Sequence, residues 1–304
     1  MNVLEVKDVY KHLGKREIIK GISFSVKEGE IFGFLGPNGA GKTTTIRMMV
    51  GLIAANKGTI SIMGHEISKE REKALSNIGA VVENPELYTY LTGRQNLMQI
   101  AAIRRISKKD VDEVIELVNL KDRIDDKVKK YSLGMKQRLG LAAALISKPK
   151  LLILDEPTNG LDPTGIMDFR DIVKHSAKEL KTAVFISSHM LSEVQQLCDT
   201  VAFINNGVIK SVEKINGGDI KRDKDTIVIF TDDIERCEEV LKNLTFVHEA
   251  HRDEKSLVLE LDNNSTPELI FSLAENKIRI TEIYKKYKGL EERYMELVEG
   301  GKRV

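Results

Sequence analysis

The fold of this chain is decided by one stretch, Gly36-Pro37-Asn38-Gly39-Ala40-Gly41-Lys42-Thr43-Thr44. From Gly36 to Thr43 it fits the phosphate-loop pattern G-x-x-x-x-G-K-[ST] at every fixed position. Glycines let backbone N–H groups turn toward a triphosphate, a lysine adds positive charge at the β- and γ-phosphates, and a threonine hydroxyl can ligate Mg²⁺. The stretch therefore predicts a nucleotide site built from all of these residues, with Thr43 on the metal ion.

The segments on either side supply the strand and the helix that this motif requires. Residues 30–35 (EIFGFL) predict a buried strand, and residues 44–50 (TTIRMMV) predict a helix. The alternative is a glycine-rich turn followed by an accidental Lys-Thr pair. The order strand, loop, helix disfavours that alternative.

Composition limits the classes of protein to which the chain can belong. A formal net charge of +1 gives no electrostatic reason to expect nucleic acid as a partner. The two cysteines, Cys198 and Cys237, form no C-x-x-C pair, so we expect a reducing compartment and neither a disulfide scaffold nor a zinc site. The charged start predicts no signal peptide, and no apolar run reaches the ~18–20 residues that span a bilayer. Any membrane role is therefore expected to come through a partner.

Hydrophobic patterning predicts an α/β fold in the first two thirds of the chain. Continuous apolar runs at residues 151–154 and 182–186 are typical of central parallel strands that are covered on both faces. The helix predicted between them, at residues 163–180, has Asp162 as its N-cap and Pro163 at its first position. This alternation of strands and helices indicates a parallel sheet around the phosphate loop.

Two further parts surround that sheet. Short alternating segments predict a small antiparallel sheet; they are residues 2–8, 18–19, 22–26 and 59–62. After a strand at residues 78–83, a helical period predicts a helical subdomain over about residues 84–148. Residues 201–204 and 208–210 flank Asn206-Gly207 and predict a hairpin.

A polar stretch from residue 216 marks a domain boundary, so we predict domains at residues 1–215 and 216–304. The second has the order βαββαβ and then one helix, which predicts a small ferredoxin-like α+β domain. Its elements are strands at 226–231, 245–250, 256–261 and 278–283, and helices at 233–243, 267–274 (capped by Thr266) and 290–298. It carries no chemical motif, because no ligand set surrounds His248 or His251. A dimerising or regulatory role is expected.

The run Leu151-Leu152-Ile153-Leu154-Asp155-Glu156 places two carboxylates at the end of a hydrophobic strand. Asp155 is in position to hold Mg²⁺ directly or through water. Glu156 follows one residue further on and is suited to orient or deprotonate the attacking water. A strand ending at a solvated acidic turn is the alternative, which the upstream phosphate loop disfavours.

Three more motifs follow the loop along the chain. They are Ser132-Leu133-Gly134-Met135-Lys136-Gln137, Gly160-Leu161-Asp162 and Ser187-Ser188-His189. The first is similar to the LSGGQ signature of ABC transporter ATPases, the second to their dimer-contacting aspartate loop and the third to their switch histidine. The chain thus resembles this family over about residues 1–215. The resemblance implies a RecA-like core with an antiparallel β subdomain and a helical subdomain.

The family resemblance also implies a mechanism and partners. ATP with Mg²⁺ is expected between two copies of the chain, or between it and a paralogous ATPase subunit. The phosphate loop of one copy and the signature of the other would enclose each ATP, with Glu156, His189 and Glu83 as catalytic residues. The chain is expected in the cytoplasm, on the inner face of the membrane, as the motor of a separate transmembrane permease.

Two departures from the family pattern bear on the site. Glu83 stands where the family has a glutamine; it can still ligate Mg²⁺, and with this signature it resembles the ATPases of bacitracin- and lantibiotic-type peptide exporters. Leu13 stands where the family often stacks an aromatic ring on adenine. Tyr10 or His12 could stack instead, with Leu13 giving only apolar contact, although a strand-end aromatic is the simpler interpretation of Tyr10.

The sequence disfavours two other classes of function. A soluble ABC ATPase of translation or nucleic-acid maintenance would have paired ATPase domains or a basic coiled-coil insertion, and neither occurs. A GTPase switch would have an N-K-x-D motif, but Asn56-Lys57 is followed by Gly58-Thr59. An antibiotic exporter motor remains, with an antimicrobial peptide as the expected substrate and another drug, a lipid-linked molecule or a polysaccharide as alternatives.

Overall fold

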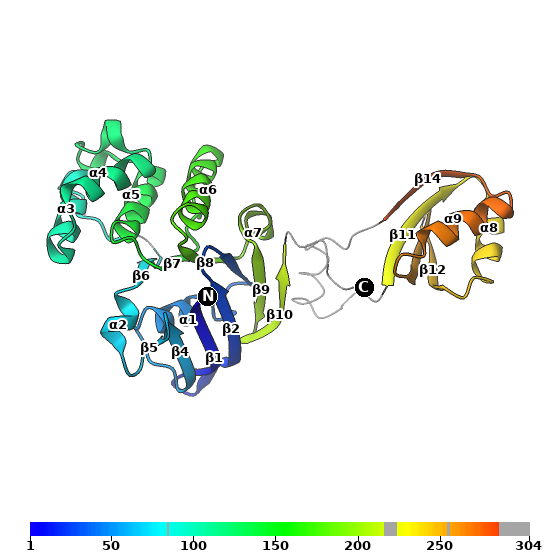
Figure 1. Cartoon of the computed structure of the whole chain (residues 1–304), viewed down its shortest axis with the longest axis horizontal. Helices are drawn as coiled ribbons and strands as arrows, with labels where there is room; N and C mark the ends of the chain where they lie inside the picture. Colours follow the sequence, from blue (N-terminus) through cyan, green and yellow to red (C-terminus); the bar gives the residue numbers. More distant parts are fainter. Residues whose placement is uncertain (84, 216–223, 254–255, 286–304) are drawn as a thin grey trace. The chain divides into compact units, whose positions relative to one another are not determined.

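The computed structural model describes residues 1–83, 85–215, 224–253 and 256–285 (Figure 1). These residues belong to two compact units, which divide between Asn216 and Gly217. The division lies within the polar stretch at which the sequence predicts a domain boundary.

The first unit is built around a six-stranded sheet. Its strands, in spatial order, are β10 (Val208–Lys214), β9 (Thr200–Asn205), β3 (Ile31–Leu35), β8 (Ala183–Ser188), β7 (Leu151–Asp155) and β6 (Ile78–Val81). All neighbouring pairs are parallel except β9 and β10, which form the predicted hairpin through Asn206-Gly207. Every residue of β3 and β7 is buried, as their unbroken apolar sequences predict.

A second, antiparallel sheet of four strands packs in the same unit. It contains β1 (Asn2–Leu13), β2 (Arg16–Lys27), β4 (Lys57–Ile62) and β5 (His65–Glu66). The prediction of separate short strands at 18–19 and 22–26 is wrong, because β2 is one continuous strand paired with β1. Register shifts along the pair, with Asp8 at a φ of 47°, break the alternation of apolar residues.

The hydrophobic core of the first unit joins the two sheets. Phe24 of β2 lies against Phe32 and Phe34 of β3, with ring centroids 5.3 and 5.6 Å apart. Phe185 of β8 completes the cluster, 5.6 Å from Phe24. The antiparallel sheet is thereby fixed against the strand that leads into the phosphate loop.

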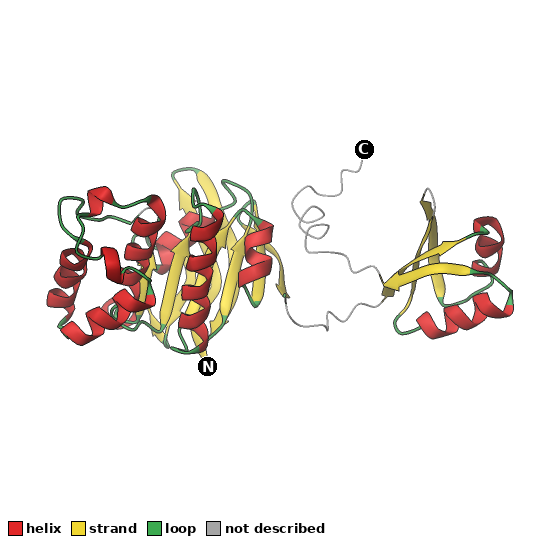
Figure 2. Ribbon diagram, turned by 90° about the horizontal axis from the view of Figure 1, so that it is seen from above, coloured by secondary structure: helices red, strands yellow, loops and turns green. Residues whose placement is uncertain are grey.

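Helices complete this unit, and Figure 2 shows several of them lying along its strands. They are α1 (Lys42–Met49), α2 (Arg71–Leu75), α3 (Gly93–Arg104), α4 (Lys108–Leu117), α5 (Leu133–Leu145), α6 (Pro163–Lys178) and α7 (Leu191–Leu197). The helices α3 to α5 form the predicted helical subdomain, beside β6 in Figure 1. The predicted cap of α6 is confirmed, because Asp162 Oδ1 accepts a hydrogen bond from Gly165 N at 3.0 Å.

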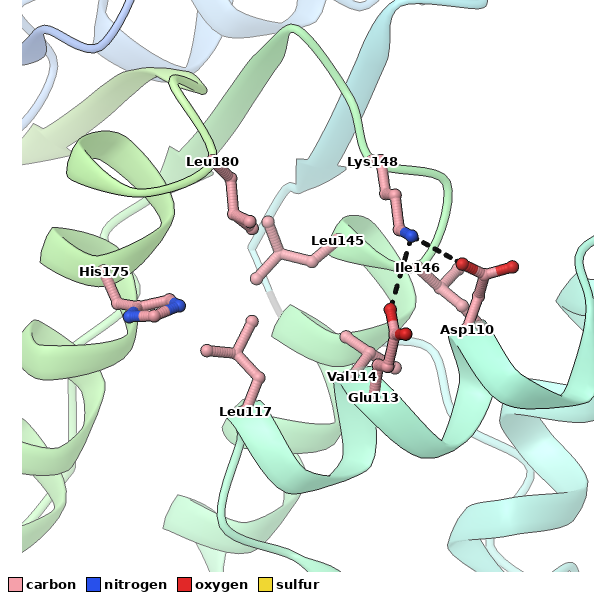
Figure 3. Close-up of a pocket in the computed structure, with 9 residues that line it drawn as sticks. All are labelled: Asp110, Glu113, Val114, Leu117, Leu145, Ile146, Lys148, His175 and Leu180. Atoms are coloured by element: carbon pink, nitrogen blue, oxygen red, sulfur yellow. Dashed lines mark hydrogen bonds and ion pairs between the residues drawn. The ribbon is translucent and has the colours of Figure 1, made fainter.

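A cavity of about 230 Å³ lies where the helical subdomain meets α6 (Figure 3). Its walls are mainly apolar side chains of α4 and α5, with Leu180 and His175 on the side of α6. At its rim, Lys148 Nζ lies 2.5 Å from Asp110 Oδ1 and 3.3 Å from Glu113 Oε2. Packing between these two parts of the unit is therefore incomplete.

The second unit has the predicted order βαββαβ. It contains β11 (Lys224–Thr231), α8 (Ile234–Leu241), β12 (Val247–Asp253), β13 (Ser256–Asp262), α9 (Thr266–Glu275) and β14 (Ile280–Lys285). The strands form an antiparallel sheet in the order β12-β13-β11-β14. The prediction that Thr266 caps α9 is wrong, because Ser265 precedes the helix and makes no side-chain cap.

A core of Ile, Leu and Cys237 side chains holds the second unit together. The helix predicted at residues 290–298 lies outside the described residues, and the ferredoxin-like description stays a prediction. In the described part of the chain, no helix has both the length and the apolar character needed to cross a membrane.

Candidate active site

The phosphate loop lies between β3 and α1, at the carboxyl edge of the parallel sheet. Its glycines are required by close packing as well as by backbone conformation. A Cβ on Gly36 would lie 2.2 Å from the carbonyl oxygen of Ile204, and one on Gly41 would lie 2.5 Å from Ile19 Cδ1. Gly39 and Gly41 have φ values of 80° and 111°, which favour glycine.

Lys42, the first residue of α1, holds its ammonium group inside the loop. Its side chain is only 6% exposed, and Nζ donates to the carbonyl oxygen of Gly36 at 2.7 Å. The same nitrogen lies 3.1 Å from Glu156 Oε1, just beyond the end of β7. The charge of the lysine is therefore held between the loop and the strand end that carries the carboxylates.

Asp155, the last residue of β7, is buried, and only one of its two carboxylate oxygens accepts a hydrogen bond of good geometry from the described residues. Ser187 Oγ donates to Asp155 Oδ1 at 2.6 Å, whereas the buried Oδ2 accepts no hydrogen bond of good geometry from the described residues. Burial raises the pKa of Asp155, and the hydroxyls of Ser187 and Thr43 act in the opposite direction. A buried oxygen of this kind beside a threonine hydroxyl fits Mg²⁺, which prefers oxygen ligands.

Glu156 connects the loop to β8. Its Oε2 lies 2.7 Å from His189 Nδ1, while its backbone N–H donates to Ser187 Oγ at 3.0 Å. Glu156 has a φ of 47°, in the left-handed region, so the backbone turns away from the direction of β7 at this residue. The structure therefore brings Lys42, Glu156 and His189 together in one chain of polar contacts.

These side chains border a cleft of about 380 Å³. Its described lining residues are Arg16, Ile18, Asn38, Gly39, Gly41, Lys42, Thr43, Thr44, Glu156, Asn159 and His189. The phosphate loop forms one part of the wall, and the start of β2 forms another. The size, the loop and the paired carboxylates fit a nucleoside triphosphate.

Comparison with known proteins agrees with this geometry. The family model described as "ABC transporter" matches residues 19–159. The ABC transporter ATP-binding protein YhcH of Bacillus subtilis (strain 168) is 47% identical over 296 residues, which cover 97% of this chain and 95% of YhcH. The chain belongs to the ABC transporter ATP-binding proteins. It is therefore an ATPase that binds ATP and ADP.

Other relatives of this ABC ATPase carry more specific names. The bacitracin transport ATP-binding protein BcrA of Bacillus licheniformis is 40% identical over 304 residues, 98% of both chains. The lantibiotic transport ATP-binding protein SrtF of Streptococcus pyogenes is 39% identical over 217 residues, 71% of this chain and 93% of SrtF. These matches confirm the resemblance to the ATPases of bacitracin- and lantibiotic-type exporters.

A solved structure confirms the ABC ATPase fold. The structure of cbiO1 from Clostridium perfringens, part of the complex cbiONQ, is 28% identical with a TM-score of 0.66. It covers 70% of this chain and 89% of cbiO1.

Glu83 of this ABC ATPase points to a neighbour that the sequence did not indicate. Its carboxylate, 57% exposed, forms an ion pair with Arg47 of α1. Among the described residues, no hydrogen bond or ion pair joins Glu83 to Thr43 or Asp155, although the charge of Glu83 helps to raise the pKa of Asp155. The described residues also hold no group of three or more His, Cys, Asp or Glu side chains that could bind a metal. A Mg²⁺ role for Glu83 stays a prediction.

The signature residues lie apart from this cleft, since none of them is among its lining residues. Ser132 caps α5, with Oγ accepting from Met135 N at 3.3 Å. The loop before α6 lies alongside, since a Cβ on Gly160 would be 3.0 Å from Leu133 Cδ2. Within the signature, Leu133 is exposed whereas Gln137 is buried. The starts of α5 and α6, with Asp162, thus form a second surface of the ATPase.

The three candidates for contact with adenine, Tyr10, His12 and Leu13, do not line the cleft. Tyr10 lies over the neighbouring strand, where a Cβ on Gly21 would come 2.6 Å from the Tyr10 hydroxyl. Leu13, at the end of β1, is 49% exposed. Arg16 and Ile18 border the cleft instead. Their spacing of two residues, which places both on one face of a strand, is the signal that could have identified them.

Proposed function

We propose that this ATPase is the cytosolic motor subunit of an exporter of antimicrobial peptides or related antibiotics. The carrying observation is the match to the bacitracin transport ATP-binding protein over 98% of both chains. That match includes the second unit as well as the nucleotide-binding unit. Among the possible substrates of an exporter, it favours peptide antibiotics.

The contacts in the cleft support a division of roles within ATP hydrolysis. Lys42 and the loop amides hold the phosphates, while Asp155 and Thr43 hold Mg²⁺, with Glu83 as the further candidate. Bound Mg²⁺ would neutralise charge on the phosphates. Glu156 orients and deprotonates water, and His189, in contact with Glu156, responds to the γ-phosphate.

Two copies are needed to enclose the nucleotide in this proposal. Ser132 and Gly134 lie at the N-terminus of helix α5. A helix N-terminus attracts a phosphate, and a glycine there lets the phosphate approach the backbone closely. This end of α5 does not border the cleft of its own chain. The facing site is therefore expected to receive α5 from a second copy or from a paralogous subunit, with Asp162 at the contact.

Coupling to a separate permease is proposed through residues 84–96, of which residue 84 lies outside the described residues. Asn96 of α3 is buried and holds this segment at both backbone groups of Tyr88, accepting at 2.9 Å and donating at 3.1 Å. The rings of Tyr88 and Tyr90 are exposed and meet edge to face at 6.0 Å. Exposed aromatic side chains on a fixed backbone suit a protein partner.

The experiment is a pull-down of the tagged protein from gently solubilised membranes of its native cell, with partners identified by mass spectrometry. A co-purifying multi-span protein that raises ATPase activity is the expected result. Cells carrying Glu156→Gln should then become more sensitive to bacitracin or a lantibiotic, whereas Glu179→Gln, an exposed control, should change nothing. Recovery with ribosomes or nucleic acid instead would reject the exporter in favour of the soluble class.

A further inference from the structure

The start of β2 forms one part of the cleft wall, through Arg16 and Ile18. Neither residue belongs to the phosphate loop or to the carboxylate strand end, so both lack an assigned role. Strand β2 touches the loop at its third and fourth residues, because a Cβ on Gly41 would lie 2.5 Å from Ile19 Cδ1 and 3.5 Å from the Ile18 carbonyl oxygen. Arg16 lies two positions further out on the same strand. At about 3.3 Å per residue, this places it roughly 6.6 Å beyond the loop contact. Because Arg16, Ile18 and the phosphate loop border the same cleft, a nucleotide whose phosphates lie in the loop has room for its sugar and base beside Arg16.

No Phe, Tyr or Trp side chain lines the cleft within the described part of the chain, and the imidazole of His189 is engaged with Glu156. Tyr10 is held over Gly21, and His12 Nε2 lies 3.6 Å from Glu17 Oε1. Arg16 has neither an ion pair nor a side-chain hydrogen bond to the other described residues, so its guanidinium is available. A guanidinium is planar and delocalised, so it can stack face to face on an aromatic ring, whereas an ammonium group has no plane to stack.

We propose that Arg16 stacks on the adenine base of ATP and that Ile18 supports the nucleotide through apolar contact. The inference rests on the ATP binding established above and names the residue that positions the base. Arg16 would thus take the place of the aromatic ring for which Tyr10 and His12 were the candidates. Stacking of this kind is tolerant of base identity, because every base has an aromatic face.

Binding of ATP and of inorganic tripolyphosphate to the same variants tests this role. Arg16→Ala should weaken ATP binding about five- to thirtyfold, the range from an exposed to a desolvated cation–π contact, and leave tripolyphosphate binding unchanged. Arg16→Lys should lose most of the same affinity because it keeps the charge without the plane. Arg16→Tyr should restore it. Lys15→Ala, which removes an exposed charge one residue away and outside the cleft, is the matched control.

Two results would overturn the proposal. Equal losses for ATP and tripolyphosphate would show that Arg16 contacts phosphate, and unchanged ATP binding by Arg16→Ala would show that it contacts nothing. Lys42→Ala separates this inference from the nucleotide site itself. If Lys42→Ala loses both ligands while Arg16→Ala loses neither, only the role of Arg16 fails.

Discussion

We predict that replacement of Glu156 by glutamine separates nucleotide binding from hydrolysis in this ATPase. The amide keeps the size of the side chain but cannot accept a proton from water at neutral pH. A general base contributes about 10²–10⁴-fold to a rate, which corresponds to about 2.7–5.4 kcal/mol of activation free energy. We therefore expect the steady-state ATPase rate of Glu156→Gln to fall by about that factor.

ATP binding should be retained or become tighter in the same variant. Glu156 Oε1 lies 3.1 Å from Lys42 Nζ, and both side chains are largely buried. A triphosphate bound in the loop would compete with this carboxylate for the ammonium group. Hydrogen bonds to charged groups are worth about 1.5–3 kcal/mol, so loss of the carboxylate charge removes a competitor of that order.

The assay measures ATP affinity by calorimetry and phosphate release under saturating ATP, with size-exclusion chromatography in ATP to detect a stable dimer. Glu179→Gln serves as the control for loss of an exposed carboxylate. Turnover within threefold of the unmodified protein would remove Glu156 from the chemical step. Weaker ATP binding would refute the competition with Lys42.

Three further predictions follow from individual contacts. Glu83→Gln removes an exposed ion pair with Arg47, so the free energy of unfolding in urea should change by at most about 1 kcal/mol; a larger loss would show that the pair is structural. Val114→Ile adds a methylene at the cavity of Figure 3 and should stabilise the protein by about 0.8 kcal/mol, whereas Val111→Ile, on the same helix and away from the cavity, should destabilise it. Cys237 is fully buried and burial raises the pKa of its thiol to about 11, so its alkylation at pH 8, followed by mass spectrometry, should be far slower in the folded protein than in urea; equal rates would contradict this.

The parts of the fold that the sequence predicted are those in which one local pattern determines the structure. Strands β3 and β7 are buried on both faces, so each shows an unbroken apolar run. The long strand β2 could not be predicted as one element. Its pairing with β1 shifts register near Asp8, and a shifted register moves side chains between the two faces.

The same distinction applies to the site. Lys42 was predicted from the phosphate-loop pattern and Glu156 from its place at the end of an apolar run, and both of these signals are local in the sequence. Arg16 was missed, because its place at the cleft depends on how a hairpin from another sheet lies over the loop. Arg47 and Glu83 lie 36 positions apart in the sequence. Their ion pair could not be predicted from the residues around either one.

The signature and the aspartate loop are a third case. For these two motifs the sequence predicts a contact between two copies, and the structure of a single chain cannot contain that contact. Ser132 and Asp162 cap neighbouring helices, which satisfies their side chains locally and would explain both residues as structural. Capping leaves the exposure of Leu133 without an explanation, since a cap does not require an apolar side chain at 43% exposure beside it. Burial of Leu133 and Gly134 against a second copy would account for that exposure. The surface formed by the starts of α5 and α6 is therefore the place at which the proposed dimer can be tested independently of catalysis, because Leu133→Lys should abolish ATP-dependent dimerisation while leaving ATP binding by the single chain intact.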